Sequence, residues 1–136
     1  MRKQILLADD DESVRKMIAR VLESAGFQVV NAGTGSEAVV RFCSSRPDLV
    51  LLDLRMPDQD GWETFEQINR RDQRVPIVVI TAWPNQQEQA AARGIDALME
   101  KPLDMALLLA TIQKFLTETE QTRTRREKER RLLCSV

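Results

Sequence analysis

The chain has 136 residues, of which 30% are charged, and its formal net charge is -1. This length fits one domain with its own core, and the near-zero charge provides no overall attraction to nucleic acid. The absence of histidine excludes a Ser/His/Asp triad, a Cys/His nucleophile and a histidine-bound metal. The sequence shows no leader pattern and no apolar run that could span a bilayer, so we expect a cytoplasmic protein without a membrane partner.

Strands and helices are predicted to alternate along residues 4–116. Short apolar runs bounded by turn residues predict strands at 4–8, 27–32, 49–53, 76–81 and 97–100. Apolar residues at helical spacing predict helices at 12–25, 34 to at least 43, 60–71, 85–93 and 104–116. This alternation implies right-handed crossovers and an α/β fold with a five-stranded, doubly wound parallel sheet of order 2-1-3-4-5. The sheet is accompanied by five helices, of which the last is extended. We expect Met17 and Cys43 to be buried on their helices.

The pattern changes after Leu116. Residues 117–131 keep helix-forming residues and charge pairs such as Arg123/Glu127, but they lose the apolar positions of a core-facing helix. No heptad seam is present, which argues against a coiled coil. We therefore expect a domain at 3–116, followed at 117–136 by a charged helical tail or a truncated linker that extends the last helix into solvent. A docking arm for an acidic partner or for RNA is the open alternative.

Polar side chains follow the predicted strands at the points where the strands end. Asp9 and Asp10 follow the first strand, and Asp53 ends the third. Thr81 ends the fourth strand and Lys101 follows the fifth. Because parallel strands end at one edge of a sheet, and ligands of open α/β sheets bind there, we expect these side chains to form one site.

The chemistry of that site follows from its charges. Neighbouring carboxylates repel one another and resist ionisation unless a cation joins them, and oxygen ligands favour Mg²⁺, with Mn²⁺ possible, over zinc. A metal ion, the ammonium of Lys101 and the hydroxyl of Thr81 would stabilise the oxygens of a transferring phosphoryl group. Asp53 would then be the nucleophile and form an aspartyl phosphate.

At these residues the sequence resembles the receiver domains of two-component response regulators. The motifs that carry the resemblance are Ile5-Leu6-Leu7-Ala8-Asp9-Asp10-Asp11-Glu12, Leu51-Leu52-Asp53-Leu54-Arg55-Met56-Pro57 with Asp60-Gly61, Ile80-Thr81-Ala82, and Lys101-Pro102. The resemblance covers about residues 3–116 and implies a flavodoxin-like sheet. It also implies that Asp53 takes a phosphoryl group from a histidine kinase or phosphotransfer protein. The domain would catalyse its own Mg²⁺-dependent phosphorylation and dephosphorylation and would switch a surface that binds a downstream protein.

The same resemblance implies roles for the remaining site residues. Asp10 would ligate Mg²⁺ directly and Asp9 through water, with Asp53 and the backbone carbonyl of Arg55 as further ligands. Lys101 would pair with Asp53 and then with the phosphoryl group, and the peptide bond between Lys101 and Pro102 would be cis. Thr81 would move to bond a phosphoryl oxygen, in the space that the small Ala82 leaves open.

Three features depart from the family pattern. Leu98 stands three positions before Lys101, where an aromatic residue is usual. The stretch between Thr81 and Gly94 is about two residues shorter than is typical of the family, which trims the fourth helix. Bulky Trp83, like Arg55, occupies a position that in receivers influences how fast water reaches the acyl phosphate.

Two other interpretations compete with phosphoacceptor function. Residues 33–38 match the loose dinucleotide fingerprint, but a capping box at Thr34 accounts for the same residues and the fingerprint leaves Lys101 unexplained. A receiver-like interaction module without control by phosphate is the stronger alternative, favoured by Leu98 and the short fourth helix. Nothing resembles a helix-turn-helix, so we expect no direct DNA binding, and a monomer or weak dimer.

Overall fold

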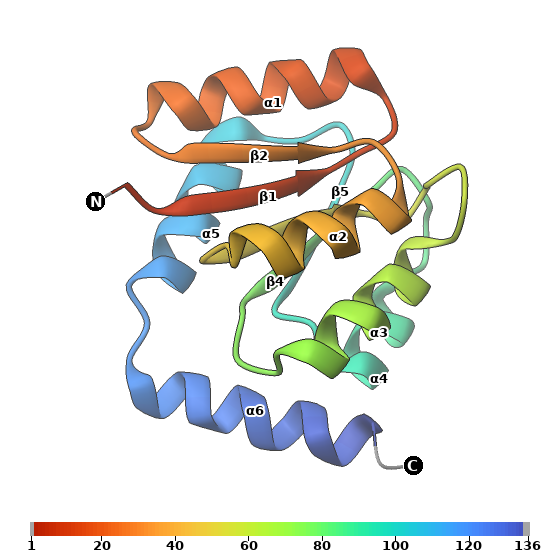
Figure 1. The fold of residues 1–136 in the computed structure, drawn as a ribbon, viewed down its shortest axis with the longest axis vertical. Coiled ribbons are helices and arrows are strands. Elements are labelled where there is room, and N and C mark those ends of the chain that lie inside the picture. The colour runs from red at the N-terminus through yellow and green to blue at the C-terminus, as the bar shows by residue number, and fades with distance from the viewer. Residues whose placement is uncertain (1, 135–136) are drawn as a thin grey trace.

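The structure, a computed structural model, describes residues 2–134 and contains one parallel sheet flanked by helices on both faces (Figure 1). The elements in chain order are β1 (Gln4–Ala8), α1 (Glu12–Ser24), β2 (Gln28–Ala32), α2 (Gly35–Ser45), β3 (Leu49–Asp53), α3 (Gly61–Arg71), β4 (Ile77–Thr81), α4 (Gln87–Arg93), β5 (Ala97–Glu100), α5 (Met105–Leu116) and α6 (Glu120–Cys134). The strand order is β2-β1-β3-β4-β5. The predicted fold class and strand order are confirmed, with a sixth helix added within the described residues.

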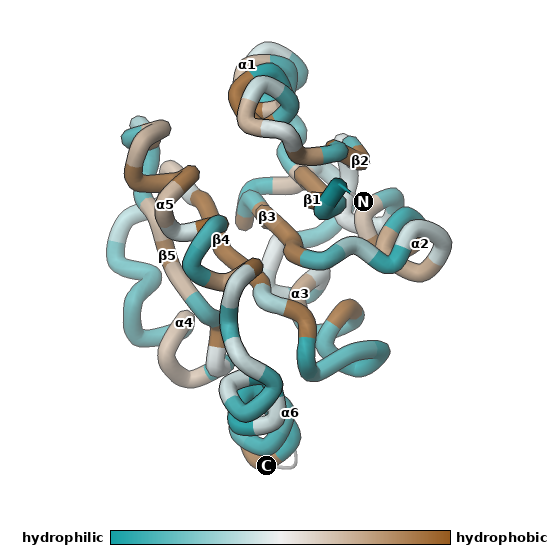
Figure 2. Tube along the Cα trace, turned by 90° about the vertical axis from the view of Figure 1, so that its left-hand side faces the viewer, coloured by the Kyte–Doolittle hydropathy of each residue, from teal (hydrophilic) through white to brown (hydrophobic). Residues whose placement is uncertain are grey.

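Alternate residues of each strand point to the two faces of the sheet and form two cores. On one face, residues such as Leu52 and Val79 pack with side chains of α2 and α3. On the other face, residues such as Leu51 and Val78 pack with α1 and α5. All residues of β3 and β4 are buried, which explains why these central strands read as continuous apolar runs. Figure 2 shows these apolar strands in the interior and the hydrophilic α6 at one end of the molecule.

Gly61 allows α3 to begin directly against the end of β3. A Cβ atom at this position would lie 2.4 Å from the Cα of Leu54 and 2.6 Å from the backbone oxygen of Asp53. The N–H of Gly61 donates to the backbone oxygen of Leu54 at 2.7 Å, and the side chain of Asp60 caps the helix by accepting from the N–H of Glu63. This close approach fixes the backbone that carries Asp53.

Three local predictions were wrong. Met17 is 51% exposed and Cys43 is also exposed, because α1 and α2 bury narrower stripes than their apolar residues suggested. In α1 the buried residues are Ile18, Ala19 and Leu22. The fourth helix begins at Gln87 rather than at Asn85, because Asn85 has a φ of 61° and lies outside the helical region.

The predicted solvated extension of the last helix was also wrong. α5 ends at Leu116, and α6 follows as a separate helix that packs back against the domain beside α4 (Figure 1). Arg126 and Arg130 of α6 are 6% and 0% exposed and form ion pairs with Asp96. The tail was misjudged because charged pairs take the place of an apolar stripe on its inner face. No helix among residues 2–134 is long and apolar enough to cross a membrane.

We expect Arg130→Ala to lower the free energy of unfolding by about 3 kcal/mol, because the substitution removes one of the ion pairs of Asp96 and the bonds of Arg130 to the backbone oxygens of Val75 and Gly94. The exposed Arg125 of the same helix supplies the control. Arg125→Ala should change stability by less than about 0.5 kcal/mol. Urea denaturation followed by circular dichroism measures both values, and equal midpoints for the two variants would contradict the packed position of α6.

Candidate acidic site at the carboxyl edge of the sheet

Three aspartates meet where β1 and β3 end. These strands are neighbours in the sheet, with Ala8 paired to Leu52, so the residues that follow them are brought together. Asp9 is fully buried and Asp53 is 3% exposed, whereas Asp10 is exposed. One carboxylate oxygen from each of the three lies within 4.8 Å of the others. The predicted convergence of these carboxylates is therefore present in the structure.

Lys101 bridges two of these carboxylates. Its Nζ atom lies 3.0 Å from Oδ2 of Asp9 and 2.9 Å from Oδ2 of Asp53. Burial acts to lower the pKa of Lys101, but the hydrogen bonds to Asp53 and Asp9 outweigh it and the pKa is raised. Burial raises the pKa of Asp9, against the hydrogen bonds from the Asp11 N–H and from Lys101. The ammonium is thus charged at neutral pH. The Lys101–Pro102 bond is cis, as predicted.

The two oxygens of Asp53 have different partners. Oδ1 accepts a hydrogen bond from the backbone N–H of Arg55 at 3.0 Å, and Oδ2 faces the ammonium of Lys101. This arrangement holds the carboxylate in one orientation at the end of β3. The carboxylate is nearly enclosed by protein and still borders the exposed Asp10.

Thr81 and its loop form the side of the site next to β5. The backbone oxygen of Thr81 accepts from the N–H of Lys101 at 2.8 Å, which places the two residues side by side. The hydroxyl oxygen of the buried Thr81 accepts from the N–H of Trp83 at 2.9 Å. Ala82 is exposed, while Trp83 and Leu98 are partly buried against the same core. The Thr81 hydroxyl is therefore held by its own loop in this conformation.

Two residues near the site were not found by sequence reasoning. Arg15 of α1 donates to the backbone oxygen of Asp9 at 2.7 Å. Asp58 accepts hydrogen bonds from the N–H groups of Gly35 and Ser36 and from the Ser36 hydroxyl, at 2.8, 2.9 and 2.5 Å. Asp58 thereby ties the loop that carries Arg55 to the start of α2. No short spacing in the sequence links Asp58 with a partner 22 residues away, so only the fold reveals this bond.

The acidic cluster has the donor set that a hard divalent cation requires. Its side-chain ligands are all carboxylate oxygens, and their mutual distances allow one ion to contact all three. Asp10 is exposed, which leaves room for the water ligands that Mg²⁺ usually keeps. The carboxylates of Asp9, Asp10 and Asp53 therefore fit Mg²⁺.

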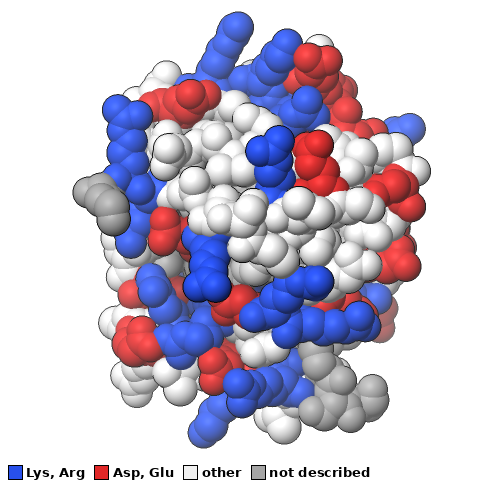
Figure 3. Space-filling view, in the orientation of Figure 1, with Lys and Arg blue, Asp and Glu red and all other residues white. Residues whose placement is uncertain are grey.

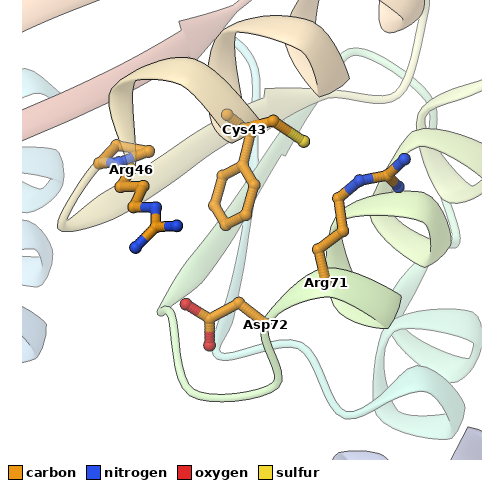
Figure 4. Close-up of a pocket in the computed structure, with 6 residues that line it drawn as sticks. Cys43, Arg46, Arg71 and Asp72 are labelled. Atoms are coloured by element: carbon orange, nitrogen blue, oxygen red, sulfur yellow. The ribbon is translucent and has the colours of Figure 1, made fainter.

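A separate hollow of about 480 Å³ lies near the C-terminal ends of α2 and α3. Figure 4 shows Arg46, Cys43, Arg71 and Asp72 around it. The hollow is lined by Phe42, Cys43, Arg46, Pro47, Arg71 and Asp72. None of these residues belongs to the acidic cluster, so the hollow and the candidate site are distinct.

The sheet order and the acidic edge define the class of protein, and comparisons with known proteins agree. The model of the response regulator receiver domain matches residues 5–113, so this chain belongs to the response regulator receiver domain family. Response regulator MprA of Mycolicibacterium vanbaalenii is 37% identical over 121 residues, which make up 88% of this chain and 52% of that protein. The chain thus spans about half the length of the MprA proteins that it matches.

Solved structures show the same likeness. A CheY-like receiver domain protein from Methanospirillum hungatei has a TM-score of 0.81 and 26% identity, and the match covers 95% of this chain and 99% of that one. The response regulator TrrA of Thermotoga maritima, solved in complex with Mg(2+)-BeF, has a TM-score of 0.78 and 27% identity, with 83% and 98% coverage. The dinucleotide interpretation of residues 33–38 is thereby replaced. Thr34 there is the N-cap of α2 and accepts from the N–H of Glu37, while Glu37 accepts from the N–H of Gly33, so these residues cap a helix.

We expect the bond between Asp58 and α2 to make stability depend on pH. The hydrogen bonds that Asp58 accepts lower its pKa from 3.8 to about 2, and the bond from the Ser36 hydroxyl has the largest effect. A carboxyl whose pKa is depressed in the folded state stabilises the folded state fully above pH 3.8. This contribution is lost as the pH falls toward 2. Asp58→Ala should therefore cost about 1 kcal/mol at neutral pH, a value limited by the exposure of the carboxylate to solvent.

Urea denaturation from neutral pH down to about pH 3 measures this difference, which should shrink across the acid range. Ser36→Ala is the matched control, because it removes only the hydroxyl bond and leaves the two backbone bonds to Asp58. It should cost less than Asp58→Ala. A difference between wild type and Asp58→Ala that stays constant with pH would contradict the assignment.

Proposed function

We propose that this chain is a phosphoacceptor receiver, in which Asp53 takes a phosphoryl group from the phosphohistidine of a histidine kinase or of a phosphotransfer protein. The observation that carries the proposal is the pair of contacts of Lys101 with Asp9 and Asp53 beside the third carboxylate of Asp10. A buried ion pair alone could have a purely structural role. A nucleophilic carboxylate, a cation and an open acidic face together are what phosphoryl transfer requires.

The proposed reaction makes one bond and breaks one. An oxygen of Asp53 attacks the phosphorus atom, the P–O bond forms as the P–N bond to the kinase imidazole breaks, and the imidazole leaves with the bonding electron pair. Oδ1 of Asp53 is held by the Arg55 N–H and Oδ2 by Lys101. On transfer, Lys101 exchanges its carboxylate partner for a phosphoryl oxygen. The Thr81 hydroxyl leaves the Trp83 N–H and donates a hydrogen bond to a second phosphoryl oxygen. Hydrolysis of the resulting acyl phosphate by water resets the domain.

The metal ligands proposed for this reaction are Asp9, Asp10, Asp53 and the Arg55 carbonyl. When bound, Mg²⁺, or Mn²⁺ in its place, offsets the repulsion between the carboxylates and the incoming phosphoryl oxygens. The Mg(2+)-BeF complex of the Thermotoga maritima relative supports the same ligand chemistry here. We further propose a downstream protein as the recipient of the signal, and residues 3–116 as the receiver unit, against which α6 packs.

Labelling tests the proposal directly. With Mg²⁺ and acetyl phosphate, the intact mass of the wild-type chain should rise by one phosphoryl group, and Asp53→Asn should not label. Lys101→Met should label about 100-fold more slowly, because a preorganised positive charge is lost from the transition state. Asp48→Asn, an exposed carboxylate before β3, is the matched control and should label normally. Full labelling of Asp53→Asn would place the acceptor at another residue, and no labelling of the wild type would favour the interaction module that phosphate does not control.

A second prediction concerns the loop after Thr81. The Thr81 hydroxyl accepts from the Trp83 N–H, so a move toward the phosphoryl group must rearrange this loop, whereas Leu98 has no polar group that rewards a change of position. A beryllofluoride titration with Mg²⁺ should change the fluorescence of Trp83 and leave amide exchange near Leu98 unchanged. Trp83→Phe, with Trp62 retained, supplies the background signal. A silent Trp83 together with new protection around Leu98 would show that Leu98 carries the switch.

A further inference from the structure

Arg130 of α6 connects two parts of the domain that lie on either side of β4. Its Nη1 donates to the backbone oxygen of Val75, just before β4, at 2.7 Å. On the other side, Nε donates to the backbone oxygen of Gly94 at 3.4 Å and Nη2 to Asp96 at 2.5 Å. The guanidinium also lies 5.5 Å from the ring centroid of Phe65 in α3. A fully buried arginine thus joins the start of β4 to the end of α4.

Arg126, one turn earlier in α6, is bonded to the segment before β4 and to Asp96. It donates to the backbone oxygen of Arg74 at 2.9 Å and to Asp96 at 2.5 Å, and it forms a two-fold ion pair with Glu118 at 2.6 Å. Asp96 also accepts from the N–H of Ile77 at 2.7 Å. Figure 3 shows basic and acidic side chains side by side at the end of the molecule where α6 lies. The inner face of α6 is therefore held by charged groups and backbone oxygens.

α4 is held at both of its ends. At its start, Gln86 accepts a hydrogen bond from the indole N–H of Trp62 at 3.1 Å. At its end, the left-handed residue Gly94 lies beneath Leu133 of α6, so closely that an added Cβ would be 2.8 Å from Cδ1 of that leucine. The position of this short helix thus depends on α3 at its start and on both α3 and α6 at its end, where Arg93 lies 3.5 Å from Glu66.

The loop that enters α4 begins at the candidate site. Thr81 is bonded to the Trp83 N–H, and α4 starts six residues after Thr81, at Gln87. A Thr81 hydroxyl that turns to a phosphoryl oxygen releases this bond and displaces the loop, and with it α4. The start of β4 cannot follow, because Val50 and Ile77 are paired within the buried centre of the sheet. The two anchors of α6 are then pulled apart.

We propose that α6 is a clasp on α4 that loosens when Asp53 is phosphorylated. The inference rests on the proposed function of the Asp53 site. Hydrogen bonds from charged groups weaken steeply when donor and acceptor separate, so a shift of Gly94 relative to Val75 weakens the bond from Arg130 to Gly94 and the packing of Gly94 against Leu133. Asp96 shares two hydrogen bonds with Ile77 and stays with β4. Coupling between two binding events is reciprocal. Loading the site therefore loosens α6, and loosening α6 favours loading of the site.

Amide hydrogen exchange on the wild-type chain tests the first half of this coupling. With Mg²⁺ present, addition of beryllofluoride, which mimics the phosphoryl group, should speed exchange of the α6 amides about fivefold or more, while β3 and β4 keep their protection. Binding with unchanged or slower exchange in α6 would overturn the clasp and leave the proposed function intact. Absence of binding, seen as no change in the native mass, would overturn both.

Variants test the reciprocal half. Glu118→Gln removes one partner of Arg126 and should leave the fold intact, and Arg130→Gln removes the central connection. Each should bind beryllofluoride severalfold more tightly than wild type, and Arg125→Gln, on the exposed side of α6, should bind as wild type does. A merely structural role for α6 predicts equal or weaker binding in all three variants. That result would overturn the clasp even if Arg130→Gln proves too unstable to measure.

Discussion

The ammonium of Lys101 between two buried carboxylates is the interaction on which the site depends. The side chains of Asp9 and Asp53 are almost inaccessible to solvent, and their negative charges repel each other across adjacent strands. An ammonium 3.0 and 2.9 Å from their oxygens makes this arrangement tolerable. Lys101 can bridge them only because β5 ends at the same edge of the sheet as β1 and β3. The parallel sheet and its crossovers thus serve to place one positive charge against two negative ones.

The sequence predicted this site well because its signals are local. Each site residue follows a short apolar run, and the end of such a run marks the edge of a buried parallel strand whatever the distant contacts are. The helices were predicted less accurately, since Met17 and Cys43 lie on flanks that an apolar pattern cannot distinguish from a buried stripe. Asp58 was missed because its partners, Gly35 and Ser36, belong to another strand–helix unit. Such a bond follows from tertiary packing alone.

α6 was missed for a different physical reason. Patterns of apolar residues detect helices that dock by hydrophobic burial, whereas α6 docks through guanidinium groups. A guanidinium has five donors in a planar fork and binds backbone oxygens as well as carboxylates. The oxygens at Val75 and Gly94 lie before a strand and after a helix, where backbone acceptors lack partners within regular structure. Arg130 satisfies both, which a leucine in its place could not do.

β4 links the two ends of the molecule that matter for signalling. Thr81 closes it at the acidic edge, and Val75, bonded to Arg130, precedes it at the opposite edge. Every residue of this strand is buried, and its pairing with β3 holds it in place. Movement that begins at Thr81 can reach α4 through the loop of the exposed Ala82 and the partly buried Trp83. The shortness of α4 limits the contacts that such a movement must break, since only Ala90 of its 7 residues is buried.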